Sequence, residues 1–118
     1  MTRLVVCRHA DPTGPEGALA PGGESYADMR GRVTRAVRGI VARHPGATVG
    51  VVTHAGPLRA LLGSWLEMRD EAVFRLDQGY GAINIVDWTD GVPFVRLVNG
   101  PWPLGYDLSG ASAPPMTD

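Results

Sequence analysis

Hydrophobic residues along this chain follow two different patterns, and each predicts a different kind of element. Apolar runs rich in β-branched residues occupy 3–8 and 48–53, and each run is followed by a histidine. Such runs are typical of buried parallel strands. Two further runs, at 82–88 and 93–98, flank the turn sequence Asp90-Gly91 and therefore predict an antiparallel hairpin. Together these patterns predict a mixed sheet of about four strands.

Helical spacing appears only after a segment that cannot hold a helix. Residues 10–24 contain three Pro and four Gly and predict a loop. Ser25, with an acid at Asp28, then matches the start of a helix, which His44-Pro45-Gly46 ends. Hydrophobic residues recur at helical spacing between these ends. They are Met29, Val33, Val37, Ile40 and Val41. Residues 58–66 predict a second, short and buried helix.

The chain has 118 residues, which suits a single α/β domain with a modest core. We expect this domain to cover residues 1–100. A tail rich in Pro, Gly and Ser begins at Asn99, and we expect residues 101–118 to be partly disordered.

Composition excludes several functional classes. The net charge of −1 gives no reason to expect a nucleic acid or a membrane surface as partner. No stretch is long enough to span a bilayer, and the N-terminus lacks the pattern of a signal peptide, so we expect a cytoplasmic protein. The single Cys7 excludes an internal disulfide and is expected to be a small buried strand residue. All eleven basic residues are Arg, as expected of a GC-rich genome such as an actinobacterial one.

Histidines follow both predicted parallel strands. His9 comes after the first strand and His54 after the second. Ligands of α/β sheets bind beyond the carboxyl ends of such strands, so adjacent strands would bring both imidazoles together, with Arg8 beside them. A helix starting near Pro57 would add its N-terminus, which favours an anion. The histidine and cysteine spacings match no zinc motif, so no metal or other cofactor is expected.

The order of these motifs resembles the histidine phosphatase superfamily, in its phosphoglycerate-mutase-like branch. There, a strand runs into Arg-His-Gly, matched here by Arg8-His9-Ala10. A later Gly-Glu-Ser opens a helix carrying an Arg, matched by Gly23-Glu24-Ser25 and Arg32. A second strand ends in Ser-His-Gly-Gly before another Arg, matched by Thr53-His54-Ala55-Gly56 and Arg59.

The resemblance covers residues 3–98 and implies a reduced three-layer fold. In typical members a long middle segment supplies two strands, a second phosphate-binding Arg and the acidic proton donor. Here only residues 10–24 stand in its place. The strand that ends at His54 would then lie near an unprotected edge of the sheet, which invites pairing with another chain. We expect a homodimer; a separate subunit carrying the missing half is the alternative.

The resemblance also implies roles for the candidate residues. His9 would be the nucleophile, forming a phosphohistidine that water hydrolyses, while His54 and Arg8 would bind the phosphoryl oxygens. Arg30, Arg32 and Arg59 are candidates for the missing clamp. Asp11, Glu16 and Glu24 are the candidates for the missing proton donor, and Glu24 is favoured because it lies next to a helix start. Asp11 is also a candidate for contact with the substrate.

Three functions follow from this reading. The first is a phosphatase acting on a phosphorylated small molecule or protein. The second is an isomerase or cyclase that uses the two histidines as acid and base on a substrate without phosphate. The third is a non-catalytic module that binds an anion or a partner protein. An anionic small molecule is the expected ligand.

Overall fold

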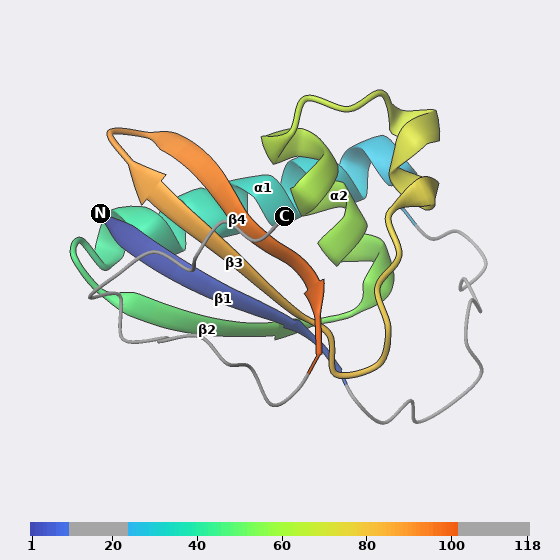
Figure 1. Ribbon diagram of the computed structural model, residues 1–118. Helices are drawn as coiled ribbons and strands as arrows, with labels where there is room; N and C mark the ends of the chain where they lie inside the picture. Colours follow the sequence, from blue (N-terminus) through green and yellow to red (C-terminus); the bar gives the residue numbers. More distant parts are fainter. Residues whose placement is uncertain (10–23, 102–118) are drawn as a thin grey trace.

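The computed structural model describes residues 1–9 and 24–101, and its four strands form one mixed sheet (Figure 1). The strand order is β2-β1-β3-β4. The strands are β1 (Thr2–Arg8), β2 (Thr48–Thr53), β3 (Ile83–Thr89) and β4 (Val92–Gly100). β1 is parallel to β2 and antiparallel to β3, which pairs antiparallel with β4. The mixed four-stranded sheet predicted from the sequence is therefore confirmed.

The hairpin between β3 and β4 forms at the predicted turn, because Asp90 and Gly91 both adopt positive φ angles, of 51° and 78°. However, β4 continues to Gly100, so the prediction that the tail begins at Asn99 is wrong. Side-chain bonds extend the strand: the Asn99 backbone N–H donates to Oδ1 of Asn84 at 2.9 Å. In turn, Oδ1 of Asn99 accepts from the N–H of Gly79 at 2.9 Å.

Two helices connect the strands. Helix α1 (Tyr26–Arg43) starts at the predicted cap, where the Ser25 hydroxyl accepts from the N–H of Asp28 at 3.1 Å, and it ends at His44 as predicted. Helix α2 (Ala55–Trp65) begins three residues earlier than Leu58, the predicted start. Pro57 permits this start because a residue in the first turn needs no intrahelical N–H bond. A short 3₁₀ helix, η1 (Asp70–Arg75), was not predicted.

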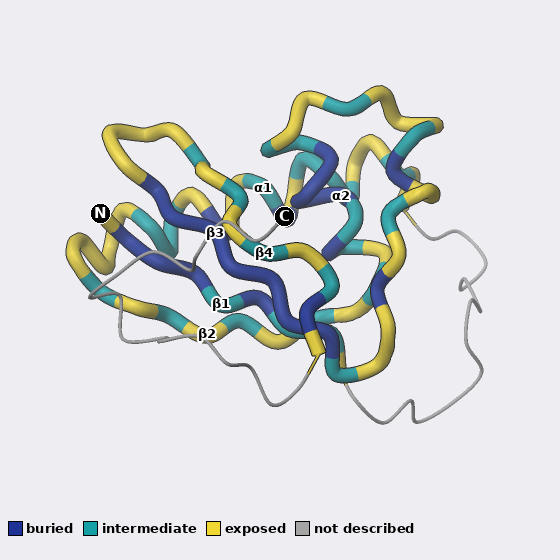
Figure 2. Tube along the Cα trace, viewed as in Figure 1, coloured by how far each residue is buried: buried dark blue, intermediate teal, exposed yellow. Residues whose placement is uncertain are grey.

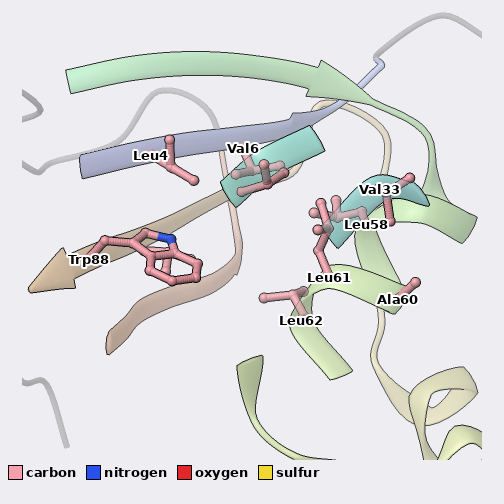
Figure 3. Packing of buried hydrophobic residues seen from close by; sticks show 10 residues of the cluster. Leu4, Val6, Val33, Leu58, Ala60, Leu61, Leu62 and Trp88 are labelled. Carbon is pink, nitrogen blue, oxygen red and sulfur yellow. The ribbon is translucent and has the colours of Figure 1, made fainter. Parts of the chain in front are cut away.

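The hydrophobic core lies between the sheet and both helices. Figure 3 shows Leu4 and Val6 of β1 and Trp88 of β3 near the leucines of α2 and Val33 of α1. All these side chains belong to one cluster, so α1 and α2 cover the same face of the sheet. The described residues thus show a sheet and one helical layer of the three layers that the resemblance implied. Neither helix within 1–9 and 24–101 combines the length and apolar character needed to cross a bilayer.

Helix α2 packs closely against η1 at Gly63. A Cβ added at this position would collide with the Val73 side chain, which is itself 1% exposed. We therefore expect Gly63→Ala to lower the free energy of unfolding by about 1–3 kcal/mol, the usual range for overpacking a core. Urea denaturation measures this change. Gly56→Ala is the control, because a Cβ there meets nothing within 4 Å. Equal stability of the two variants would contradict this account of the packing.

Candidate active site

The two sequence-predicted histidines lie side by side at the carboxyl ends of β1 and β2. Arg8 and Thr53 are paired in the parallel register, so the next residue of each strand is a histidine. The backbone N–H of His9 donates to the Thr53 carbonyl at 2.8 Å. The imidazole centroids of His9 and His54 are 6.1 Å apart, and both residues are exposed. Two imidazoles thus face the space beyond the sheet, where a ligand can reach both.

Helix α2 begins next to these imidazoles. His54 is its N-cap residue, and the imidazole makes no capping bond to the helix. The first turn of an α-helix carries backbone N–H groups without intrahelical acceptors and the positive end of the helix dipole. In α2 this turn starts with Ala55 and Gly56, whose small side chains leave the backbone accessible. An anion held between the histidines would therefore gain favourable electrostatic interactions with this helix end.

Arg8 is oriented by the loop that precedes β3. Its Nη1 donates to the Gln78 carbonyl oxygen at 2.5 Å, and its guanidinium carbon lies 4.1 Å from the centroid of the Tyr80 ring. Gln78 is buried and exchanges two hydrogen bonds with the side chain of Asn84. Sequence reasoning did not identify Gln78 or Tyr80. The only sequence signal for these contacts was Asn84, a polar residue within a largely apolar strand.

A pocket of about 460 Å³ adjoins the Tyr80 loop. The described residues that line it are uncharged, so their chemistry differs from that of the cationic and histidine groups at the strand ends. The lining residues are Gly79, Tyr80, Gly81, Ala82, Asn99, Gly100 and Pro101.

The other predicted cations are engaged by protein groups. Nη2 of Arg32 donates to the Glu24 carboxylate at 2.5 Å. Nε of Arg59 donates to the Leu76 carbonyl at 2.8 Å, and Arg30 pairs with Asp70 at the surface. The hydrogen bond from Arg32 lowers the pKa of Glu24 below its usual range, which favours a carboxylate over a proton donor. Asp11 and Glu16 lie outside the described residues.

The family model described as histidine phosphatase superfamily (branch 1) matches residues 8–101. This chain belongs to the histidine phosphatase superfamily. Among the proteins similar to this chain, the bifunctional protein Rv2228c of Mycobacterium tuberculosis is 39% identical over 80 residues. The match covers 67% of this chain but only 22% of the relative, so this chain spans about a fifth of that protein's length. The mycobacterial source of this relative fits the kind of genome expected from the arginine-rich, lysine-free composition of this chain.

Solved structures show the same superfamily fold. YhfR from Bacillus stearothermophilus is 28% identical, with a TM-score of 0.61 over 71% of this chain and 40% of the other. The α-ribazole phosphatase from Shigella flexneri is 20% identical, with a TM-score of 0.59 over 72% of this chain and 42% of the other. At that identity the second match shows the fold alone. This chain matches only 40% and 42% of these two solved chains, which fits the reduced form of the fold expected from the sequence.

Cys7 is another potential nucleophile, near the carboxyl end of β1. It is half-buried, and burial raises the pKa of its thiol, which lowers the fraction of reactive thiolate at neutral pH. Within the described part of the chain, no three His, Cys, Asp or Glu residues gather as a metal site would require. The two imidazoles are therefore the strongest candidates for chemistry.

Proposed function

We propose that this chain hydrolyses phosphate monoesters through a phosphohistidine on His9. The observation that carries this proposal is the pairing of His9 and His54 at 6.1 Å beside the start of α2. An imidazole nitrogen of His9 attacks phosphorus, so that a P–N bond forms while the P–O bond to the leaving group breaks. A phenol leaves as the phenolate, whereas an alkoxide takes up a proton from water. Water then attacks phosphorus, the P–N bond breaks, and inorganic phosphate leaves.

His54, Arg8 and the first turn of α2 stabilise the charge that develops on the phosphoryl oxygens. His54 donates a hydrogen bond from its imidazole, which faces the ring of His9. Arg8 follows the same strand as His9, and its contacts with Gln78 and Tyr80 set the direction of the guanidinium. Groups that are already oriented cost little reorganisation when the transition state forms.

The substrate that fits this site has a phosphate and an uncharged organic part. The pocket next to Tyr80 is large enough for a small organic group, at about 460 Å³, and its lining within residues 1–9 and 24–101 is uncharged. The exposed Tyr80 ring offers a surface for stacking. A second anionic group on the substrate would meet no cation among the described residues that line this pocket. We therefore propose small neutral alcohols or phenols as leaving groups.

Glu24 is the acid that its place beside the start of α1 favoured as proton donor, but its hydrogen bond from Arg32 argues against that role. A carboxylate with a lowered pKa protonates an alkoxide poorly near neutral pH. We expect Glu24→Gln to change kcat on an aryl phosphate, whose leaving group needs no proton, by less than about threefold. Arg32→Gln raises the pKa of Glu24 and should speed turnover of alkyl phosphates below neutral pH. A rate on aryl phosphate that collapses in Glu24→Gln would contradict this.

Phosphate release from a panel of alkyl and aryl phosphate monoesters tests the proposed function. Vanadate imitates the phosphoryl transition state, and we expect it to inhibit release much more strongly than inorganic phosphate does. Vanadate binding without any turnover would instead support an anion-binding module. Turnover of substrates lacking phosphate, indifferent to vanadate, would support acid–base chemistry by the two histidines.

A further inference from the structure

The two edge strands of the sheet, β2 and β4, differ in the features that keep an edge from pairing with another chain. Strand β4 carries Pro93 and Arg96, and its pairing with β3 has two register shifts. Prolines, charges and bulges are the usual features that keep an edge from pairing with another chain. Strand β2 has none of them: its sequence, Thr-Val-Gly-Val-Val-Thr, holds neither a charged residue nor a proline. Figure 2 shows β2 as an edge of intermediate and exposed residues.

The outer side of β2 presents its backbone at alternate residues. The carbonyls of Ala47 and Thr53 accept bonds from β1, so residues of that parity face inward. Gly50 and Val52 have the opposite parity, and their backbone groups point away from β1. Both are exposed, and the Val52 side chain retains 68% of its accessible surface. An exposed apolar side chain on an uncharged edge is the pattern of a strand that pairs with another strand.

We propose that β2 pairs antiparallel with β2 of a second copy of this chain, about a twofold axis at Gly50, and that Arg43 of each copy completes the other copy's phosphate site. This inference rests on the proposed function for the role of Arg43. The pairing makes one continuous sheet. Val52 then lies opposite Thr48 of the second copy, a cross-strand pair of two β-branched residues.

The same symmetry decides what approaches the active site. In the register that places Gly50 opposite Gly50, His54 lies opposite Gly46 of the second copy. Gly46 comes three residues after Arg43, the last residue of α1. A twofold axis perpendicular to the sheet keeps the helices of both copies on the same side, where α2 begins. The C-terminal end of the second copy's α1 therefore comes next to His54.

Arg43 supplies a second guanidinium, in addition to Arg8, because the other candidate arginines in the described part of one copy are bound by protein groups. Arg32 and Arg59 bind Glu24 and the Leu76 carbonyl, respectively. Arg43 is exposed, and its guanidinium lies along its own helix over Gly39, with Nη1 3.1 Å from the position of an added Cβ. A side chain resting on a glycine of its own helix can swing out at little cost. Each site of the dimer would gain a second guanidinium for the phosphate oxygens.

Disulfide trapping tests the pairing without any assay of activity. In a Cys7→Ser background, Gly50→Cys places two thiols on the twofold axis, and a Cβ at Gly50 meets nothing within 4 Å. Directly opposed residues of a hydrogen-bonded pair have Cα atoms about 5.5 Å apart, within the range of a disulfide. We expect mild oxidation to convert most of this variant to a covalent dimer. The control is Val92→Cys on β4, at a residue that is 50% exposed. This variant should form at least about tenfold less covalent dimer.

Sedimentation velocity on the unmodified chain completes this test. We expect a dimer, which Val52→Lys converts to a monomer and Val92→Lys leaves intact. A monomeric wild type at micromolar concentration would overturn the pairing, as would equal cross-linking at positions 50 and 92. Slow hydrogen exchange of the Gly50 and Val52 amides in a monomer would also overturn it, because another segment of the same chain would then occupy the edge.

Binding of inorganic phosphate, measured by calorimetry, tests the role of Arg43. We expect Arg43→Ala to weaken binding about tenfold, the usual effect of losing one charged hydrogen bond. Arg35→Ala is the matched control, because Arg35 rests over Gly31 as Arg43 rests over Gly39. Val52→Lys should weaken binding as much as Arg43→Ala does, and the two changes together should weaken it no further.

An unchanged affinity in Arg43→Ala, or additive effects with Val52→Lys, would overturn the contribution of Arg43 from the second copy. These measurements are independent of turnover. If the chain binds phosphate as described but releases none from any ester, the proposed phosphatase function fails and the shared site stands. If esters are hydrolysed by a monomer, the shared site fails and the proposed function stands.

Discussion

Replacing His9 with alanine should reduce phosphate release from an aryl phosphate by about a thousandfold or more, because the variant has no nitrogen to form the P–N bond. The remaining groups can still bind the phosphate. We therefore expect the affinity for inorganic phosphate to fall much less than kcat. Initial rates with wild type and variant at saturating substrate, together with calorimetry, measure both effects.

His44→Ala is the matched control for this substitution. His44 is exposed like His9, but it ends α1 and uses its backbone carbonyl to accept from the Thr2 hydroxyl at 2.8 Å. Its imidazole has no role in the proposed chemistry. We expect an unchanged rate in this variant. Because exposed side chains contribute little to stability, both variants should unfold within about 0.5 kcal/mol of the wild type.

Rapid quenching makes the experiment specific for the proposed intermediate. Wild type mixed briefly with substrate should carry one phosphoryl group that is labile in acid and stable in base, as expected of a P–N bond. His9→Ala should carry none. Retention of more than about a tenth of the wild-type rate in His9→Ala would show that another group attacks phosphorus and would end the phosphohistidine proposal.

The sequence predicts the backbone arrangement of this site because the apolar patterns report burial directly. The uninterrupted run at 48–53 is β2 with the same bounds, and the Ser25 cap sets the start of α1. Parallel pairing of β1 and β2 then leaves little freedom for the histidines that follow them. Two short motifs, far apart in the sequence, thereby specify one end of the sheet.

The partners of the arginines could not be predicted in the same way. Arg8 binds Gln78, 70 residues away, and Arg59 binds the carbonyl of Leu76 at the end of η1. Such bonds to backbone carbonyls leave no mark in the pattern of hydrophobic positions, because any residue supplies a carbonyl. The extension of β4 has a different cause: backbone N–H groups donate to the amide side chains of Asn84 and Asn99, and hydrophobic patterning does not register such bonds. Side-chain identity alone did not distinguish an arginine that binds substrate from one that binds the protein.

Replacing Asp87 with asparagine should lower the free energy of unfolding by about 3–5 kcal/mol, because it leaves a buried guanidinium without its counter-charge. Arg3 and Asp87 are each 1% exposed, and Nε and Nη2 of Arg3 donate to the two carboxylate oxygens at 2.6 and 2.9 Å. Arg96 donates to the same carboxylate from the surface at 3.1 Å. Chemical denaturation of wild type and variant at neutral pH measures the loss.

Two further variants show where the loss comes from. Arg96→Ala removes only the partly exposed partner and should cost less than about 1 kcal/mol. The double substitution Arg3→Met, Asp87→Leu removes both buried charges together. We expect it to recover more than half of the stability lost in Asp87→Asn, because apolar side chains of similar size fill the same space without a desolvation penalty. No recovery would mean that shape, and not the unpaired charge, causes the loss.

The pH dependence of stability gives this prediction its sharpest form. Burial alone would raise the pKa of Asp87, but the hydrogen bonds from Arg3 and Arg96 outweigh it and hold the pKa below its usual range. Because the folded-state pKa is depressed, the contribution of Asp87 is complete above the unfolded pKa of about 3.9 and disappears as the pH falls through the folded value. The stability gap between wild type and Asp87→Asn should therefore stay constant from neutral pH to about pH 5 and narrow below it. A gap that stays constant down to pH 2.5 would show that the ionised carboxylate contributes nothing to the fold.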